Sequence, residues 1–387
     1  MKLKECIMSL KSCFRWYNIL FIGILFSNYE IGSFLVSDIY YLLFSIFIVI
    51  KTKVGKMNID HLYIYITFFL LLSIYNYYTY HHIKAFLSCL RFVYGFFISV
   101  LLIATLNKSK YRHIVINAYL DFCVFFSLFL LMQFLSYYLL HVKIDFSLGS
   151  NIRGSGYFSD LYDPRYDINY RTGGFFYEPS HYASFVSPSL FLLSRPMQKI
   201  KFILVFLGVL VSTSGLGYVI LSLWGIWMCL KPGNFTLKVG LISIVVIAVS
   251  LMPFVFERVS SGGSYEVRII EGWMILYDNA TVSLWGIDPH IYMEDDGSRV
   301  FFANTFQYLY INYGIVGVLT FVMFTYYKRV PFVSLSIFAI IFIEGINGRI
   351  EFWLLLFVLY LYEKEKERQD RCPPRLLGDC RECRLVS

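Results

Sequence analysis

The stretch AFLSCLRFVYGFFISVLL, residues 85–102, carries a single charged side chain, Arg91. A helix needs about 20 predominantly apolar residues to cross the hydrocarbon core of a bilayer. The apolar run continues without another charge to Leu106, so it is long enough for one crossing. The sequence therefore predicts a membrane-spanning helix over 85–106 that holds an arginine within it.

The composition of the whole chain agrees with repeated membrane crossing. Of its 387 residues, 58% are hydrophobic and 16% are charged, whereas soluble domains carry roughly a quarter charged residues. The mean hydropathy is +0.61. A formal net charge of +8 would suit nucleic acid, but the positive residues fall in short loops between apolar runs, as the positive-inside rule requires. Composition thus predicts a polytopic membrane protein with the lipid bilayer, and no nucleic acid, as its partner.

Apolar segments alternate with polar connections along the chain and predict an all-α protein with about 12 transmembrane helices. No internal repeat and no matched pair of broken helices is evident, which disfavours a transporter. The predicted spans are 17–29, 32–50, 60–79, 85–106, 113–140, 180–194, 199–212, 215–230, 236–255, 304–327, 330–346 and 350–362.

Lysine and arginine side chains gather in alternate short connections between these spans, and this bias marks the cytoplasmic side. Both termini are therefore predicted to be cytoplasmic, with two long connections, about 141–179 and 256–303, on the outer side. Residues 1–362 would form a single integral membrane domain. In the last residues Arg, Pro and Cys replace Lys, Ile and Tyr, so 363–387 is predicted to be a disordered cytoplasmic tail.

The first outer connection ends in RTGGFFYEPSHYA, residues 171–183, which gathers polar residues between apolar runs. Arg171 precedes a glycine pair that would let the backbone approach a ligand. Pro179 suits the first position of a helix, and a helix N-terminus favours an anion. The planar guanidinium of arginine fits phosphate oxygens in a bidentate way. Together these features predict a site for a diphosphate at the outer membrane surface.

Glu178 is the candidate for proton transfer in the same stretch. It follows three aromatic residues, 175–177, and partial burial among such rings makes a carboxylate a stronger base. A structural ion pair with Arg171 is the alternative. His181 lies three residues further along, so it shares a helix face with Glu178, either as a participant or as a structural histidine.

The second outer connection contains GGSYEVRIIEGWMIL, residues 262–276, with apolar residues at helical spacing. Val267, Ile270, Met274 and Tyr277 would form one face of a helix lying near the membrane. Arg268 would then project toward the first connection, so that two arginines clamp one substrate.

Three further arginines are candidates for substrate binding. Arg153 and Arg258 lie in the outer connections, where a solvated surface charge is the alternative. Arg91 lies inside a span, where an arginine is functional by default because burying it unpaired is costly. We interpret it as lining the substrate cavity, with snorkelling to the surface as the alternative.

The sequence gives little support for a metal or another cofactor. Glu294, Asp295 and Asp296 could hold a cation, but a solvated loop is the simpler interpretation. The outer connections contain no Asp-x-Asp motif. We therefore predict neither a metal nor a cofactor.

Three segments in this order resemble the O-antigen polymerase family (Wzy-type), which is related to the O-antigen ligase superfamily. RTGGFFYEPSHYASF resembles the family's stretch of Arg, Gly, an aromatic and Glu-Pro-Ser before a span. STSGLGYVIL, from Ser212, is similar to its Ser/Thr-Ser-Gly segment. The run from Arg268 through WGIDP to ANTFQYLYINYGIVG resembles its second loop and following helix, with Asn304 and the Gly314–Gly317 pair in the expected places. The resemblance covers about residues 150–330.

The resemblance implies a GT-C-like fold and a metal-independent glycosyltransferase in the bacterial inner membrane. Such an enzyme joins oligosaccharide repeat units carried on undecaprenyl diphosphate at the periplasmic face, in concert with a chain-length regulator and a flippase. By resemblance, Arg171 and Arg268 hold the donor diphosphate, and Glu178 positions or deprotonates the acceptor hydroxyl. The candidate substrate-binding residues are Arg91, Arg153, His181, Arg258 and Asn304.

Two other functions compete with polymerisation. The related ligases, which transfer glycan to lipid A-core, usually carry a histidine before the asparagine that opens the later span. Here Ala303 precedes Asn304, which favours a polymerase. A lipid-linked oligosaccharide flippase should keep its charges inside the spans and its loops short, whereas this chain concentrates polar residues in two long connections.

Overall fold

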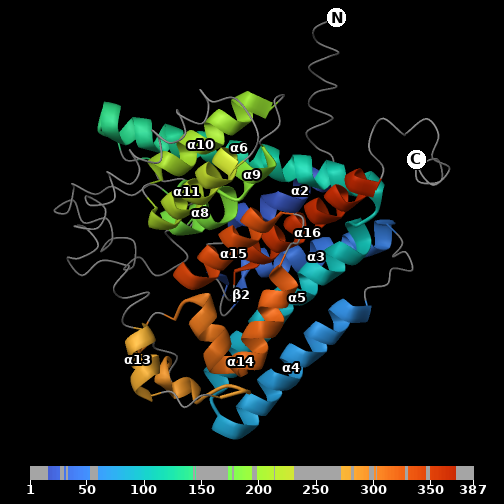
Figure 1. Cartoon of the computed structure of the whole chain (residues 1–387), viewed down its shortest axis with the longest axis vertical. Helices are drawn as coiled ribbons and strands as arrows, with labels where there is room; N and C mark the ends of the chain where they lie inside the picture. Colours follow the sequence, from blue (N-terminus) through green and yellow to red (C-terminus); the bar gives the residue numbers. More distant parts are fainter. Residues whose placement is uncertain are drawn as a thin grey trace, which may run out of the picture.

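The computed structural model describes most of the predicted helical segments of the chain (Figure 1). The described residues are 16–26, 30–31, 34–52, 60–142, 144, 173–176, 178–193, 198–212, 214–230, 272–279, 283–295, 300–301, 303–326, 330–345 and 349–371.

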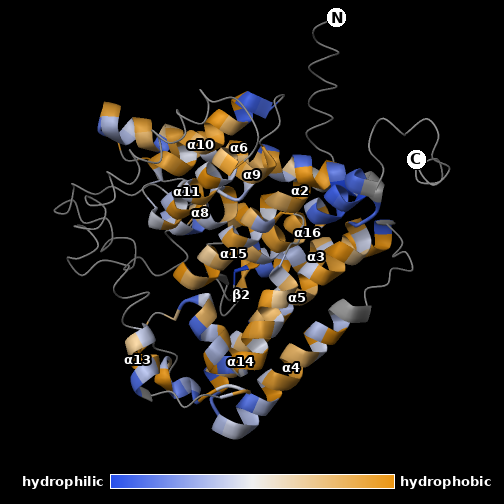
Figure 2. Cartoon of the chain, in the orientation of Figure 1, coloured by the Kyte–Doolittle hydropathy of each residue, from blue (hydrophilic) through white to orange (hydrophobic). Residues whose placement is uncertain are grey.

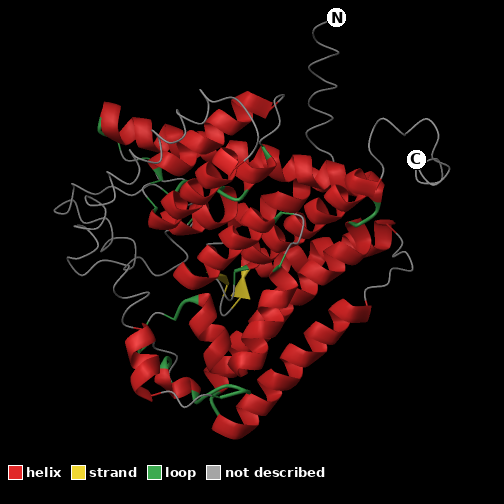
Figure 3. Ribbon diagram, viewed as in Figure 1, coloured by secondary structure: helices red, strands yellow, loops and turns green. Residues whose placement is uncertain are grey.

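Helices account for most of the described residues, which confirms the all-α class (Figure 3). The paired strands among the described residues are β1 (Glu30–Ile31) and β2 (Phe34–Leu35), with Glu30 opposite Leu35 in antiparallel register. In chain order the helices are α2 (Trp16–Ile22), η1 (Gly23–Phe26), α3 (Val36–Thr52), α4 (Asp60–Tyr80), α5 (Ile83–Leu106), α6 (Ser109–Leu140), α8 (Pro179–Val186), α9 (Ser189–Leu192), α10 (Lys199–Val211), α11 (Gly215–Leu230), α13 (Gly272–Asn279), η5 (Pro289–Ile291), α14 (Thr305–Thr325), α15 (Pro331–Ile343) and α16 (Ile350–Arg371).

Three helical segments among the described residues are long and apolar enough to cross a membrane: Ile83–Leu106, Tyr111–Leu140 and Thr305–Thr325. Gly215–Leu230 and Pro331–Ile343 are apolar but shorter. The chain therefore has the character of a membrane protein. The count of about 12 crossings and the GT-C-like arrangement stay predictions, and the predicted span 236–255 lies outside the described residues.

Large apolar side chains point outward from α3 and α4. Leu43 is 62% exposed and Ile64 is 66% exposed, and Figure 2 shows apolar residues in α3 and in the middle of α4. Extended apolar surface of this kind is rare on soluble monomers. Contact with lipid tails would remove its cost.

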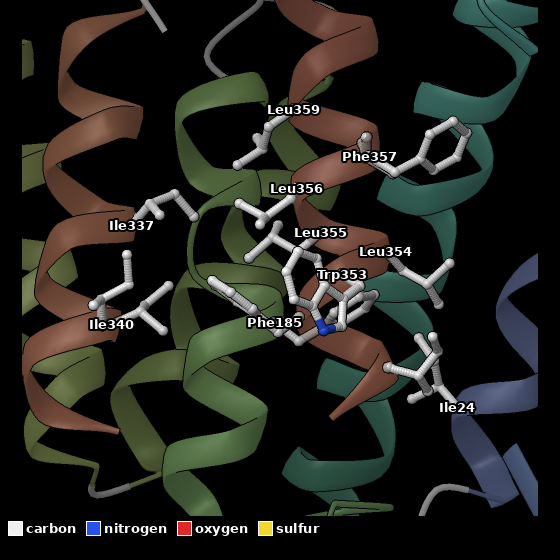
Figure 4. Packing of buried hydrophobic residues seen from close by; sticks show 14 of the residues in the cluster. Ile24, Phe185, Ile337, Ile340, Trp353, Leu354, Leu355, Leu356, Phe357 and Leu359 are labelled. Atoms are coloured by element: carbon white, nitrogen blue, oxygen red, sulfur yellow. The ribbon is translucent and has the colours of Figure 1, made fainter. Parts of the chain in front are cut away.

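The first half of α16 forms the centre of the helix bundle. A helix that is apolar all round belongs in a core, and Leu354, Leu355 and Leu356 are at most 1% exposed. Figure 4 shows side chains of α8 and α15 gathered around this helix. Trp353 stacks on Phe96 of α5 with ring centroids 5.3 Å apart.

Two helix boundaries differ from the prediction. The span predicted at 180–194 is two short helices, α8 and α9, separated at Ser187–Pro188, because proline lacks a backbone N–H and its ring crowds the carbonyl four residues earlier. In contrast, α16 continues beyond the predicted boundary at 362 to Arg371. Ion pairs between Lys364 and Glu367 and between Glu365 and Arg368 support this extension.

The helix α14 is broken at Gly314, whose φ of 66° and ψ of −168° are not helical. A break leaves backbone groups without helical partners, and a segment of the second predicted outer connection satisfies them. Ile287 N donates to Ile311 O at 2.8 Å, and Ile315 N donates to Ser283 O at 3.2 Å. The loop 283–287 is therefore built into the helix bundle.

Contacts near helix ends mark two regions of the bundle. At one end Thr305 N, at the start of α14, donates to Glu344 O, just after α15, and Gly174, before α8, bonds Gln133 of α6. At the opposite end of α6, Arg112 lies 4.0 Å from Glu365 of α16. We call the first region, around Gly174, Thr305 and Glu344, the α8–α14 end. Both long predicted outer connections lead into it.

Candidate active site at the α8–α14 end

The glycine pair before α8 forms a tight turn against α6. Gly174 has a φ of +63°, and its N–H donates to Gln133 Oε1 at 3.0 Å. A Cβ on Gly173 would lie 2.7 Å from Phe176 O. The following ring of Phe175 stacks on Phe125 of α6, with centroids 5.7 Å apart. In the described structure the turn and its packing against α6 require these glycines, and the approach of their backbone to a ligand stays a prediction.

The predicted start of the helix after this turn is confirmed. Pro179 occupies the first turn of α8, and Glu178 is its N-cap residue with extended backbone angles. The Glu178 side chain makes no capping hydrogen bond and instead accepts one from Ser180 Oγ at 3.1 Å. A carboxylate at this position is stabilised by the helix dipole.

Glu178 belongs to a cluster with His181 and Glu344, whose potential ligand atoms all lie within 4.8 Å of one another. His181 Nε2 is 4.0 Å from Glu344 Oε2, and the two side chains are 7% and 1% exposed. The predicted shared face of Glu178 and His181 is therefore real. Carboxylates and imidazole are the residue types that can take part in acid–base chemistry.

The same three residues are the described groups best placed to hold a cation near α8. A zinc ion with ligands at about 2.1 Å would bring the ligand atoms to roughly 3.4 Å from one another. The separation of His181 Nε2 from Glu344 Oε2 is larger, at 4.0 Å. At this separation the two groups interact by charge and not through a hydrogen bond.

Glu344 is a member of the cluster that sequence reasoning missed. It closes the apolar run IFAIIFIEGING, inside the predicted span 330–346. An acidic residue within a predicted span is functional by default, and this signal could have identified it. Its main-chain oxygen accepts hydrogen bonds from Thr305 N at 2.8 Å and from Thr305 Oγ1 at 2.6 Å, so the end of α15 is bound to the start of α14.

Asn304, a predicted substrate-binding residue, caps α14. Its Oδ1 accepts from Gln307 N at 2.9 Å, and Gln307 Oε1 accepts from Asn304 N at 2.9 Å. This reciprocal pair is a capping box. Asn304 is fully buried, so in this structure it holds the start of α14 in place.

The segment after Arg268 also reaches this end. Gly272 packs so closely on Gln307 that a Cβ on Gly272 would lie 2.8 Å from the Gln307 amide group. Of the predicted apolar face, the described residues Met274 and Tyr277 of α13 are 60% and 89% exposed, so they point away from the protein, and the position of this face near the membrane stays a prediction. Leu276 is buried instead. Trp273 contacts Phe306 of α14, and this tertiary contact decides which side of α13 faces inward.

The other predicted arginines of the site lie outside the described residues: Arg153, Arg171, Arg258 and Arg268. In the sequence, Arg171 precedes Gly173 by two positions and Arg268 precedes Gly272 by four. Both of these glycines are described, and each contacts a residue of the α8–α14 end. The pairing of the arginines on one substrate stays a prediction.

Arg91 is held by an acid within the membrane part of the chain. Its Nη2 donates to Asp38 Oδ2 of α3 at 2.9 Å, and Tyr94 Oη donates to the backbone oxygen of Asp38 at 2.6 Å. The ion pair compensates the cost of placing the guanidinium inside a span. Neither interpretation made from the sequence included this partner, and a role of Arg91 in lining a substrate cavity stays a prediction.

Of the predicted acidic cluster, Asp295 belongs to a hydrogen-bonded group with His290 and Asp288, which we call the His290 clasp. His290 contacts Asp288 Oδ1 through Nδ1 at 2.7 Å and Asp295 Oδ1 through Nε2 at 3.0 Å. Its ring lies 4.5 Å from the ring of His82. His82 Nδ1 accepts from Ala85 N, and Nε2 contacts Met293 O. Both nitrogens of His82 are thus occupied, so His82, His290 and Asp295 do not form a metal site.

This clasp should depend on pH. The hydrogen bond with Asp288, and after it that with Asp295, raises the pKa of His290 above its usual 6.5. The stabilisation is therefore fully present below the unfolded pKa and is lost as pH rises through the raised folded pKa. We expect the melting temperature of the wild type to exceed that of His290→Gln at about pH 6, and the difference to shrink toward about pH 9. A difference that is constant over this range would contradict the protonation of His290 in the clasp.

A cavity lies at the opposite end of α6, away from the clustered acids. Its lining includes His113 of α6, Leu192 of α9, Gln198 before α10 and Glu365 of α16. It shares no residue with the Glu178 cluster.

Comparison with protein-family models, with curated proteins and with solved structures finds no match for this chain. The function of the site is therefore inferred from its own residues and from the motif resemblance.

Proposed function

We propose that the protein is a membrane-embedded glycosyltransferase that moves a glycan from a polyprenyl diphosphate to a hydroxyl acceptor. The convergence of Glu178, His181 and Glu344 at the α8–α14 end carries this proposal. These groups can accept a proton from an acceptor hydroxyl, and they lie where two long arginine-bearing connections enter the helix bundle. A membrane scaffold would have no need for such a cluster.

We assign the binding of the donor to the arginines. Arg171 and Arg268 would bind the diphosphate and stabilise the charge that develops as it departs from the anomeric carbon. Arginine suits this role because its guanidinium makes bidentate contacts with phosphate oxygens. A diphosphate is a good leaving group, so the proposed reaction proceeds without a metal or another cofactor.

Within this class we propose a surface polysaccharide polymerase that joins undecaprenyl-diphosphate-linked repeat units at the periplasmic face of the inner membrane. A chain-length regulator and a flippase would be its partners. The Glu-Pro-Ser motif and the order of the three resembling segments support this choice. The position at which related ligases usually carry histidine is Ala303, and its side chain is buried. That position therefore offers no polar group for a ligase reaction.

The proposal is tested by replacing Arg171 with Ala in the native strain and separating the surface glycan on a gel. A polymerase defect leaves a single repeat unit attached to the lipid core. A ligase or flippase defect leaves no attached glycan. Unchanged long glycan chains would show that Arg171 is not part of the site. The loss of all attached glycan would contradict polymerisation.

A further inference from the structure

We propose that the buried pair His181–Glu344 takes over the proton that Glu178 removes from the acceptor hydroxyl, with Glu344 as the positioning residue for His181. This inference rests on the proposed glycosyltransferase function. It adds a buried acid to the reaction, and it gives the histidine a role beyond substrate binding.

The burial of the three side chains indicates the order in which they would receive the proton. Glu178 is partly exposed, whereas the side chains of His181 and Glu344 are 7% and 1% exposed. Only Glu178 of the three is open enough to touch a bulky glycan acceptor. His181 lies behind it on the same face of α8, and Glu344 approaches His181 from the end of α15.

The position of Glu344 is fixed through its main chain. The two hydrogen bonds from Thr305 hold the Glu344 carbonyl at the start of α14, and Glu344 N donates to Ile340 O at 2.9 Å. None of these bonds uses the Glu344 carboxylate. The side chain is thus directed at His181 by backbone contacts that an isosteric substitution leaves intact.

The same contacts connect the acceptor side with the donor side. Thr305 follows the capping residue Asn304, which exchanges hydrogen bonds with Gln307. Gln307 in turn packs on Gly272, four residues after Arg268. A continuous set of contacts therefore runs from the proton-accepting cluster to the segment that carries a predicted diphosphate ligand.

The reaction balances with these groups alone. A lone pair of the acceptor oxygen forms the new bond to the anomeric carbon, while the bond from that carbon to the diphosphate oxygen breaks and its electron pair leaves with the diphosphate. The acceptor proton passes to the Glu178 carboxylate and from there to His181. The imidazolium that results lies between two carboxylates, and at 4.0 Å from Glu344 Oε2 its interaction with that carboxylate is a charge–charge attraction, since a hydrogen bond would be shorter.

The test uses the purified full chain in detergent. Its substrate is lipid-linked repeat units extracted from a deletion mutant of the native strain that does not make this protein. We expect Glu344→Gln to lower kcat on the order of 10²-fold with little change in KM, because Glu344 does not touch the substrate. Glu344→Asp should recover part of kcat, since it keeps the charge. The control Glu365→Gln, in the ion pair at the opposite end of α6, should behave as the wild type does.

The double variant His181→Gln/Glu344→Gln distinguishes one unit from two independent residues. Residues that act as a unit give non-additive losses, so the double variant should be no slower than the slower single variant. Additive losses, or a wild-type kcat in Glu344→Gln, would overturn the inference and leave the polymerase proposal standing. If Glu344→Gln lowers the melting temperature, the kcat values of Glu344→Asp and His181→Gln test the inference in its place. Failure of the wild type to lengthen glycan would instead refute the proposed function itself.

Discussion

Glu178→Gln is expected to abolish the lengthening of glycan chains, with kcat lowered by about 10²- to 10⁴-fold, the usual contribution of a general base. The substitution keeps the size of the side chain and removes its ability to take up a proton. Glu178 makes no capping hydrogen bond to α8, so the helix should start as before. The measurement is the rate of elongation by the purified variant, together with its melting temperature.

Two further variants separate catalysis from a structural role at this position. Ser180→Ala removes the hydroxyl that donates to Glu178 Oε2 and should lower the rate far less, because the carboxylate remains. If Glu178 is instead half of an ion pair with Arg171, the exchange Arg171→Glu/Glu178→Arg should restore activity. Recovery in the exchanged protein would contradict a role in proton transfer.

Gly314→Ala is expected to prevent the stable folding of the protein. The backbone at Gly314 has a φ of 66° and a ψ of −168°, a region that is essentially restricted to glycine. A Cβ there would also overlap the backbone of Leu284, in the loop docked against the break in α14. The backbone strain alone costs about 1–3 kcal/mol, and the overlap would displace the loop that satisfies the broken helix.

The comparison is with Gly215→Ala at the start of α11, where a Cβ would meet no atom within 4 Å. We expect Gly215→Ala to elute as a single species in detergent with a melting temperature near that of the wild type. Gly314→Ala should aggregate or melt well below it. Equal melting temperatures for the two variants would show that the docking of residues 283–287 on α14 does not stabilise the fold.

Local features of the site could be predicted from the sequence because they depend on neighbours along the chain. Pro179 fixes its own backbone angle and begins α8, and helical spacing brings Glu178 and His181 to one face. The alternation of apolar and polar stretches is local as well, and the described helices match most of the predicted spans.

Contacts between distant residues could not be predicted in this way. Glu344 is bound by Thr305, which is 39 positions away, and Arg91 is held by Asp38, which is 53 positions away. The break at Gly314 lies inside the predicted span 304–327, and a loop from another part of the chain packs against it. A helical pattern reveals which face is apolar and does not identify the element that covers it.

The most direct test of the account is to incubate the purified wild-type protein with lipid-linked repeat units and to separate the glycan products by size. A polymerase should give a ladder of products that grow by one repeat unit at a time, with the release of undecaprenyl diphosphate, and no ladder with Arg171→Ala. Repeat units that remain single with well-folded wild-type protein, with no diphosphate released, would contradict it.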